Sequence, residues 1–231
     1  LELMVYQELT LSLKYGCSLS LGKDLFYLDY DWRQDYRHLA QVLDNKIKGI
    51  QAEWGADIAI ALIGQSMANL GIKYYLRFNQ NAKYANIIRW YTFGPPWRGS
   101  FNSLELMRTG YYAAGKKLVG FPPEFVTAYP SGYQLLPQQA GLVDKNAKPV
   151  QDFNIYEVDT WFKYNIANIN QLNPTLAPDV LQLLLTDAKN FAQELNGFDG
   201  YESTLSQLCF AGDHNQAVTN ALWDKSIQSV I

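Results

Sequence analysis

Short apolar runs alternate with amphipathic segments over residues 1–93. The continuous apolar run at residues 25–28 is typical of a strand buried on both faces and predicts a strand at residues 24–30. Further strands are predicted at residues 58–63, a short buried apolar segment, and at residues 87–93. Apolar residues at helical spacing predict a helix at residues 35–54. Helices are also predicted at residues 2–14, where the apolar residues have mixed spacing and Gly16 ends the segment, and at residues 67–79. This alternation of strands and helices predicts an α/β fold, with a mostly parallel sheet and helices on both of its faces.

The pattern changes after Phe93, where glycine and proline become frequent. Residues 94–137 predict a long loop with one short helix at 103–112, and a long irregular stretch inside a compact domain is usually a lid or a binding wall. Amphipathic spacing then predicts a helix over residues 178–195, and a return to the sheet at residues 205–211.

Length and pattern together predict the domain organisation. A chain of 231 residues, 48% of them apolar, can bury one sizeable core. We expect a single domain over residues 1–231, in which residues 94–200 contain a lid-like or cap-like insertion. Because the chain begins at Leu1 and ends on the apolar run Ser229-Val230-Ile231, we expect this domain to be incomplete at both ends.

Composition narrows the classes of partner. The formal net charge of -3, with lysine and arginine scattered, argues against a nucleic-acid partner. Two histidines, His38 and His214, and two cysteines, Cys17 and Cys209, lack metal-ligand spacing, so we expect no metal site and no cofactor; a disulfide between the cysteines stays open. No apolar run is long enough to span a bilayer and no targeting segment is visible, so a soluble protein is expected. The compartment and the oligomeric state stay open.

The strongest local signal is a serine between a predicted strand and a predicted helix. The strand at residues 58–63 reads Ile-Ala-Ile-Ala-Leu-Ile and leads directly into Gly64-Gln65-Ser66-Met67-Ala68. A sharp strand-to-helix turn exposes the serine hydroxyl at the carboxyl edge of a sheet, and it has room only for small residues two before and two after the serine. Gly64 and Ala68 meet that requirement.

This interpretation, a nucleophile elbow, assigns roles to the residues of the turn. Ser66 would be the nucleophile, and the N–H of Met67, at the positive end of the following helix, would stabilise an oxyanion. A serine hydroxyl also needs a histidine base and an orienting acid. The competing interpretation is a glycine-rich turn with an incidental surface serine, because Gly-x-Ser-x-Ala alone is a weak pattern. The buried strand before the turn and the helix after it favour the elbow.

Four segments resemble the lecithin:cholesterol acyltransferase family, in the order in which the family has them. The elbow and the following helix, from Gly64 to Arg77, resemble its Gly-His-Ser-Met-Gly-Gly-Leu segment and the aromatic pair after it. The other three are Tyr30-Asp-Trp-Arg33, Gly94-Pro-Pro-Trp-Arg-Gly-Ser100 and Pro130-Ser-Gly-Tyr-Gln-Leu-Leu-Pro137. The resemblance covers most of residues 1–220 and implies an α/β-hydrolase fold.

The chain departs from the family pattern at the elbow. Gln65 stands where the family usually has histidine, and Ala68 where it usually has glycine, but neither change removes the nucleophile. The resemblance places the family's oxyanion loop before residue 1 and its acid and base after residue 231. His214 is the candidate base within the chain, but the adjacent Asp213 cannot orient it, since neighbouring side chains on an extended segment point to opposite faces. A polar loop residue is the favoured interpretation of His214.

The resemblance implies a serine-dependent lipid acyl hydrolase, such as a lipase or phospholipase, or an O-acyltransferase, acting through a seryl acyl-enzyme. A lipid or long-chain ester would be the substrate, and peripheral contact with a membrane surface is left open. We expect the pocket wall at Trp32, Pro95, Pro96 and Trp97, with Asp31 and Arg33 paired beside it. The alternative is a non-catalytic α/β-hydrolase relative that binds a lipid or a partner protein.

Overall fold

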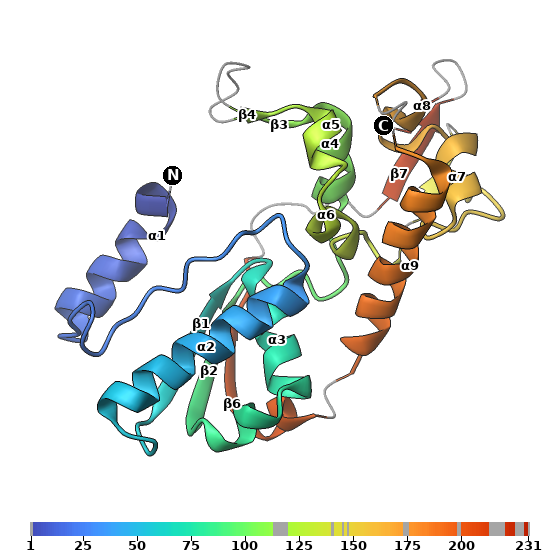
Figure 1. Ribbon diagram of the computed structural model, residues 1–231. Coiled ribbons are helices and arrows are strands. Elements are labelled where there is room, and N and C mark those ends of the chain that lie inside the picture. The colour runs from blue at the N-terminus through green and yellow to red at the C-terminus, as the bar shows by residue number, and fades with distance from the viewer. Residues whose placement is uncertain are drawn as a thin grey trace. The chain divides into compact units, whose positions relative to one another are not determined.

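The computed structural model describes residues 2–112, 120–139, 141–144, 146, 148–172, 176–197, 200–212, 220–224 and 229–230. The chain divides into two compact units, residues 1–30 and residues 31–231 (Figure 1). The expectation of a single domain therefore stays a prediction. Over the described residues, no helix combines the length and the apolar character needed to cross a membrane.

The first unit contains a helix followed by an extended segment. Helix α1 (Glu2–Leu11) continues into a π-helical turn, η1 (Ser12–Gly16), where the sequence predicts a helix. The strand predicted at residues 24–30 is wrong: Leu25 forms an isolated bridge with Leu21, and residues 26–30 have no strand assignment. An apolar run becomes a strand only when a neighbouring strand accepts its backbone hydrogen bonds, and the sequence pattern does not report that neighbour.

A parallel three-stranded sheet organises part of the second unit. Its strands are β1 (Ile60–Gln65), β2 (Ile87–Phe93) and β6 (Ser206–Phe210), with β2 in the middle. The register aligns Gln65 with Phe93, and Phe93 with Phe210, so the three strands end at the same edge. The predicted parallel sheet is confirmed, and its carboxyl edge is where α/β sheets place their ligands.

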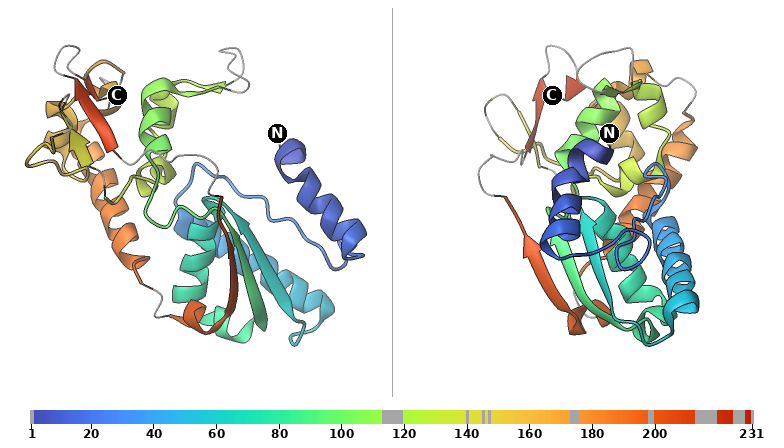
Figure 2. Two further views of the ribbon diagram at one scale, coloured as in Figure 1. Left: turned by 180° about the vertical axis from the view of Figure 1, so that it is seen from behind. Right: turned by 90° about the vertical axis from the view of Figure 1, so that its left-hand side faces the viewer.

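Helices α2 (Tyr36–Trp54) and α3 (Ala68–Phe78) lie together on one face of this sheet (Figure 2). The Asp35 carboxylate accepts the Arg37 N–H and caps α2, and Gly55, whose φ is 102°, ends it. The buried face of the layer is formed by apolar side chains at Leu39, Leu43, Ile47, Leu62, Leu70, Ile72, Leu76 and Trp90. On the opposite face of the sheet Ile63, Leu208 and Phe210 are exposed.

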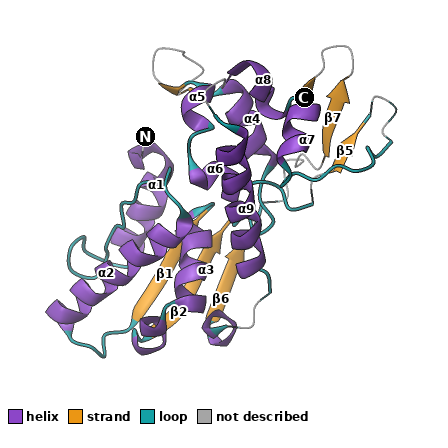
Figure 3. Ribbon diagram, turned by 45° about the vertical axis from the view of Figure 1, so that its right-hand side comes forward, coloured by secondary structure: helices purple, strands orange, loops and turns teal. Residues whose placement is uncertain are grey.

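The chain between β2 and β6 builds a mainly helical region (Figure 3). In order it contains α4 (Phe101–Thr109), β3 (Tyr111–Tyr112), β4 (Gly120–Phe121), α5 (Pro123–Val126), α6 (Pro130–Gln134), β5 (Gly141–Val143), α7 (Val158–Lys163), η4 (Ile166–Asn168), α8 (Ile169–Leu172), α9 (Pro178–Glu194) and η5 (Tyr201–Thr204). Elsewhere in the chain lie η2 (Gln80–Tyr84), β7 (Asn220–Asp224) and β8 (Ser229–Val230). Strand β7 pairs in parallel with β5 and antiparallel with β8, while β3 and β4 form a hairpin.

This helical region has its own hydrophobic core. Tyr133 of α6, Trp161 of α7 and Leu181 and Leu185 of α9 are almost completely buried in one cluster. The Tyr133 hydroxyl donates to the Thr127 carbonyl (2.8 Å), and the Trp161 indole N–H donates to the Ile155 carbonyl (2.7 Å). The region predicted as an insertion is therefore a packed structure, and its role as a lid stays a prediction.

Candidate active site

The turn between β1 and α3 is centred on Ser66, which has a left-handed backbone. Its φ is 50°, in a region that residues with a Cβ seldom adopt, and its side chain is exposed. Holding a residue in this region costs on the order of 1–3 kcal/mol, so the conformation persists only where neighbouring groups fix it.

Hydrogen bonds hold the Ser66 backbone from both sides. Its N–H donates to the carbonyl of Phe93 at the end of β2 (2.8 Å). Its carbonyl accepts two bonds from Asn69, one from the backbone N–H (3.2 Å) and one from the side-chain Nδ2 (3.0 Å). The turn is thus tied to the sheet on one side and to the first turn of α3 on the other.

Gly64 leaves the space that this arrangement needs. A Cβ at Gly64 would collide with the Asn69 amide oxygen and would lie 2.8 Å from the Ile72 methyl group, Cδ1. The residue two before the serine must therefore be small because it packs directly against side chains of α3. Ala68, two residues after the serine, is the first residue of α3 and is half-buried.

Met67 occupies the start of α3, where a backbone N–H can face a developing negative charge. Among the described residues, no group accepts a hydrogen bond from its N–H. Its side chain is fixed from the other side, since the hydroxyl of the buried Tyr36 donates to Met67 Sδ (3.1 Å). The helix dipole adds a partial positive charge at the same place.

An open pocket of about 430 Å³ lies at the carboxyl edge of the sheet. It is lined by residues at or just beyond the ends of the three parallel strands: Gln65, Ser66, Phe93, Gly94, Phe210, Ala211 and Gly212. The rings of Phe93 and Phe210 stack, with centroids 4.6 Å apart and planes at 7°. The serine hydroxyl is therefore next to an apolar surface formed by two strands.

The residues predicted as the pocket wall lie outside this lining. The ring of Trp97 packs on the buried Trp90 (centroids 5.6 Å apart), with Lys73 Nζ 5.2 Å from the ring centroid. Pro95 and Pro96 shape the intervening turn, and their carbonyls accept from the N–H groups of Trp97 and Gly99. The assignment of these residues to a substrate wall stays a prediction.

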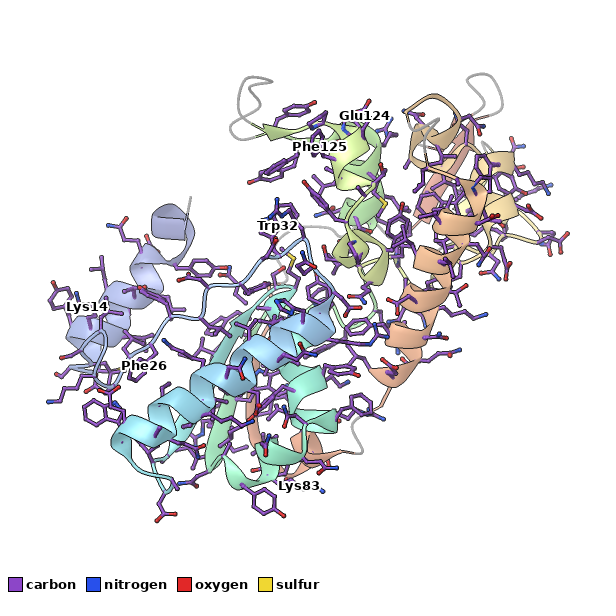
Figure 4. All side chains as sticks on the ribbon, viewed as in Figure 1. Lys14, Phe26, Trp32, Lys83, Glu124 and Phe125 are labelled. Carbon is purple, nitrogen blue, oxygen red and sulfur yellow. The ribbon has the colours of Figure 1, made fainter. Side chains whose placement is uncertain are left out.

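Trp32 belongs to an aromatic cluster on the hairpin side of the helical region. Its ring meets those of Tyr111, Phe121 and Tyr129 at centroid distances of 6.5, 6.1 and 5.6 Å. Figure 4 shows the Trp32 side chain beside the β3–β4 hairpin. Trp32 thus packs against the helical region and does not line the pocket at Ser66.

The ion pair predicted between Asp31 and Arg33 is present. Arg33 donates through Nε and Nη2 to the two oxygens of the Asp31 carboxylate, both at 2.7 Å. The hydrogen bonds from Arg33 lower the pKa of Asp31 to about 2, so this carboxylate is ionised at neutral pH. Asp31 is therefore a fixed partner of Arg33 and is unsuited to accept a proton in catalysis.

A histidine base for Ser66 is not found in the part of the chain that the structure describes. His38 lies on the exposed side of α2, and His214, the candidate base, lies outside the described residues, as does Asp213. Among the described residues, no group hydrogen-bonds the Ser66 hydroxyl.

The disulfide that the sequence left open is absent from the described part of the chain. Cys209 on β6 and Cys17 are both free and exposed.

The sequence interpretation missed Asn69, Phe93, Phe210 and Gly212 as parts of the site. Asn69 lies three residues after Ser66, the helical spacing at which a side chain can reach back to the serine carbonyl. The aligned ends of the strands predicted at 87–93 and 205–211 would have brought Phe93 and Phe210 to the serine's edge of the sheet.

Comparison with known proteins supplies a family and a fold. The model of the lecithin:cholesterol acyltransferase family matches residues 7–208. Among solved structures, a chain from "The crystal structure of Tle4-Tli4 complex" is similar, with a TM-score of 0.54, 17% sequence identity and a match that covers 87% of this chain. The chain spans about half, 52%, of the length of that structure's chain. A search of curated proteins finds no match. The parallel sheet, the helices and this similarity identify an α/β-hydrolase fold, and the chain belongs to the lecithin:cholesterol acyltransferase family.

Proposed function

We propose that Ser66 is the nucleophile of a lipid acyl hydrolase or O-acyltransferase that works through a seryl acyl-enzyme. One observation carries the proposal: an exposed serine with a left-handed backbone stands between a parallel strand and the start of a helix, over an open pocket. This geometry presents the hydroxyl to a substrate and directs the start of the helix at the same point. Membership of a family of lipid acyltransferases supports the choice of an acyl ester as substrate.

The reaction follows from the groups at the turn. The Ser66 oxygen attacks the ester carbonyl while a histidine base takes its proton, and the Met67 N–H donates to the resulting oxyanion. Collapse of this intermediate breaks the bond to the alcohol, which leaves with the proton from the base. Water or a second alcohol then attacks the seryl ester while the base takes its proton, and the base returns this proton to the Ser66 oxygen as the ester bond breaks, giving hydrolysis or acyl transfer. We place the base and its acid outside the described residues.

The stacked Phe93 and Phe210 rings support a long acyl chain in the substrate. They form an apolar surface in the pocket that contains Ser66, and burying apolar area there would stabilise an alkyl chain by about 25 cal/mol per Å². A short acetyl group could cover little of this surface.

The nucleophile is tested by labelling the full-length protein with a fluorophosphonate, which modifies activated serines. Labelling should map to Ser66, and Ser66→Ala should abolish it while the melting temperature stays within about 2 °C, since surface substitutions usually change stability little. Ser203→Ala, on the exposed η5 turn, is the matched control and should leave labelling unchanged. Labelling that survives Ser66→Ala would refute the assignment.

The substrate class is tested with p-nitrophenyl esters of increasing chain length. We expect kcat/KM to rise from acetyl to long-chain esters, and Phe210→Ala to reduce the long-chain rate more than the acetyl rate. An acetyl ester that reacts faster than every longer ester would contradict the proposed lipid substrate.

A further inference from the structure

We propose that the Asn69 side chain is a positioning residue for the Ser66–Met67 peptide, and that it thereby aims the oxyanion donor of the site. This inference rests on the proposed function of Ser66. Its basis is the pair of hydrogen bonds that Asn69 donates to one carbonyl, that of Ser66.

The geometry links this carbonyl to the oxyanion donor. The Ser66 carbonyl and the Met67 N–H belong to the same planar, trans peptide, so they point in opposite directions and rotate together. A group that fixes the direction of the carbonyl also fixes the direction of the N–H. The Asn69 backbone N–H is at 3.2 Å from this carbonyl, and the side-chain Nδ2 is closer, at 3.0 Å.

The burial of Asn69 removes its side-chain amide from solvent, and Nδ2 donates to the Ser66 carbonyl. The residue has no exposed surface, and its Oδ1 has no hydrogen-bond partner among the described residues. A buried acceptor without a partner costs stability, and asparagine is a poor helix former, so neither burial nor helix propensity accounts for the residue. The useful contact is the one that Nδ2 makes with Ser66.

The rest of the elbow is consistent with this role. Gly64 has no side chain at the place where the Asn69 amide lies. Ser66 keeps its left-handed φ of 50° with this additional bond in place.

A second turn in the same protein shows that a serine can make the same pair of hydrogen bonds as Asn69. At the start of α4, the Ser103 N–H (3.2 Å) and Ser103 Oγ (2.8 Å) both donate to the Ser100 carbonyl, three residues earlier. Asn69→Ser can therefore keep a side-chain donor on the Ser66 carbonyl, while Asn69→Ala cannot. The two variants vacate nearly the same volume, so their comparison isolates the hydrogen bond.

The test measures fluorophosphonate labelling of the full-length protein as a function of probe concentration. We expect Asn69→Ala to lower the limiting labelling rate about fivefold, because a hydrogen bond is worth about 1 kcal/mol and each 1.4 kcal/mol changes a rate tenfold, with the half-saturating probe concentration unchanged. Asn69→Ser should stay within about threefold of the wild type. Asn69→Ser should also lose less thermal stability than Asn69→Ala, because it keeps this hydrogen bond. Asn86→Gly, which removes an amide-to-carbonyl bond (to Asp57, 2.7 Å) at the opposite edge of the sheet, should leave the rate unchanged.

Equal labelling rates in the Asn69→Ala and Asn69→Ser variants would overturn the proposal, whatever their stability. Amide hydrogen exchange of Ser66 keeps the test independent of catalysis, because the Ser66 N–H is bonded to the Phe93 carbonyl in the same turn. Exchange should accelerate in Asn69→Ala and stay near the wild-type rate in Asn69→Ser. If the wild type is not labelled at Ser66, the proposed function fails, and the exchange rates still decide whether Asn69 holds the turn.

Discussion

The turn at Ser66 is closely packed, and at Gly64 it leaves no room for a side chain. The Cα of Gly64 faces the Asn69 amide and the Ile72 side chain. Gly64→Ala should therefore reduce the free energy of unfolding by about 1–3 kcal/mol, the usual cost of overpacking, and should lower the rate of Ser66 labelling as well.

Gly49→Ala supplies the control for this substitution. Gly49 lies in the interior of α2, and a Cβ there would meet nothing within 4 Å. Alanine at an exposed helical position should stabilise the protein by about 0.5–1 kcal/mol. Urea denaturation of both variants measures the two effects. A stable Gly64→Ala variant with unchanged labelling would show that the elbow has room that the structure does not indicate.

At the scale of elements, α2 and α3 approach closely because Gly71 has no side chain. A Cβ at Gly71 would lie 2.5, 2.6 and 2.8 Å from the Cδ2, Cγ and Cβ atoms of the buried Leu39. Contact with an atom as near the backbone as Cβ cannot be relieved by rotating the side chain alone. This packing sets the position of α3, and α3 begins at the candidate oxyanion donor.

The contact between these helices can be tested with a double-mutant cycle. Gly71→Ala should lower the free energy of unfolding by about 1–3 kcal/mol, although alanine is the better helix former. Leu39→Ala should cost about 2–5 kcal/mol by leaving a cavity. In the double variant the new methyl group occupies part of that cavity, so the combined loss should be smaller than the sum by about 0.5–3 kcal/mol. Strict additivity would mean that the two side chains do not share this space.

Sequence patterns predicted the elements of the sheet layer well, because those elements are long and periodic. The strand at 87–93 and the helices at 35–54 and 67–79 match β2, α2 and α3 to within one residue. The short helices α5 and α6 were missed, since Pro123 and Pro130 at their starts also fit a loop. The predicted strand at 24–30 failed because its apolar run has no pairing strand.

In the candidate site, too, the sequence predicted the local arrangement but not the contacts between distant segments. Ser66, Met67 and Gly64 follow from a local motif that runs from strand to turn to helix, so the sequence predicted their arrangement. Phe210 reaches the pocket through the pairing of β2 with β6, more than a hundred residues apart in sequence, and a local pattern contains no such contact. The bond from Asn69 to Ser66 depends on a side-chain rotamer, which the spacing of residues permits but does not fix.

At the scale of the second unit, two buried cores meet at the end of α9. One lies between the sheet and helices α2 and α3, and the other lies within the helical region. Lys73 of α3, itself buried, donates to the carbonyls of Leu195 and Gly197 just after α9, both at 2.7 Å. A cation at the carboxyl end of a helix is favoured by the helix dipole, so this contact ties the two cores together.

Each core contains a buried tyrosine, and this links the stability of the unit to alkaline pH. Burial raises the pKa of Tyr75 in α3, with a smaller contribution from the charge of Asp44, and burial also raises the pKa of Tyr133 in α6. In the unfolded chain a tyrosine ionises near pH 10. The native state therefore keeps these protons where the unfolded state loses them, so their contribution to stability is complete below about pH 10 and is lost as the pH rises further.

A spectrophotometric titration with parallel circular dichroism should resolve this loss. Some of the 16 tyrosines should ionise while the helical signal is constant, and a late fraction, including Tyr75 and Tyr133, should ionise only as that signal disappears. Tyr133→Phe should reduce the late fraction, because it removes one buried hydroxyl along with its bond to Thr127, whereas Tyr84→Phe, at an exposed position, should leave it unchanged. Because the two tyrosines lie in different cores, a shared late step would show that the cores unfold together. Complete ionisation with an unchanged helical signal would contradict the burial of both residues.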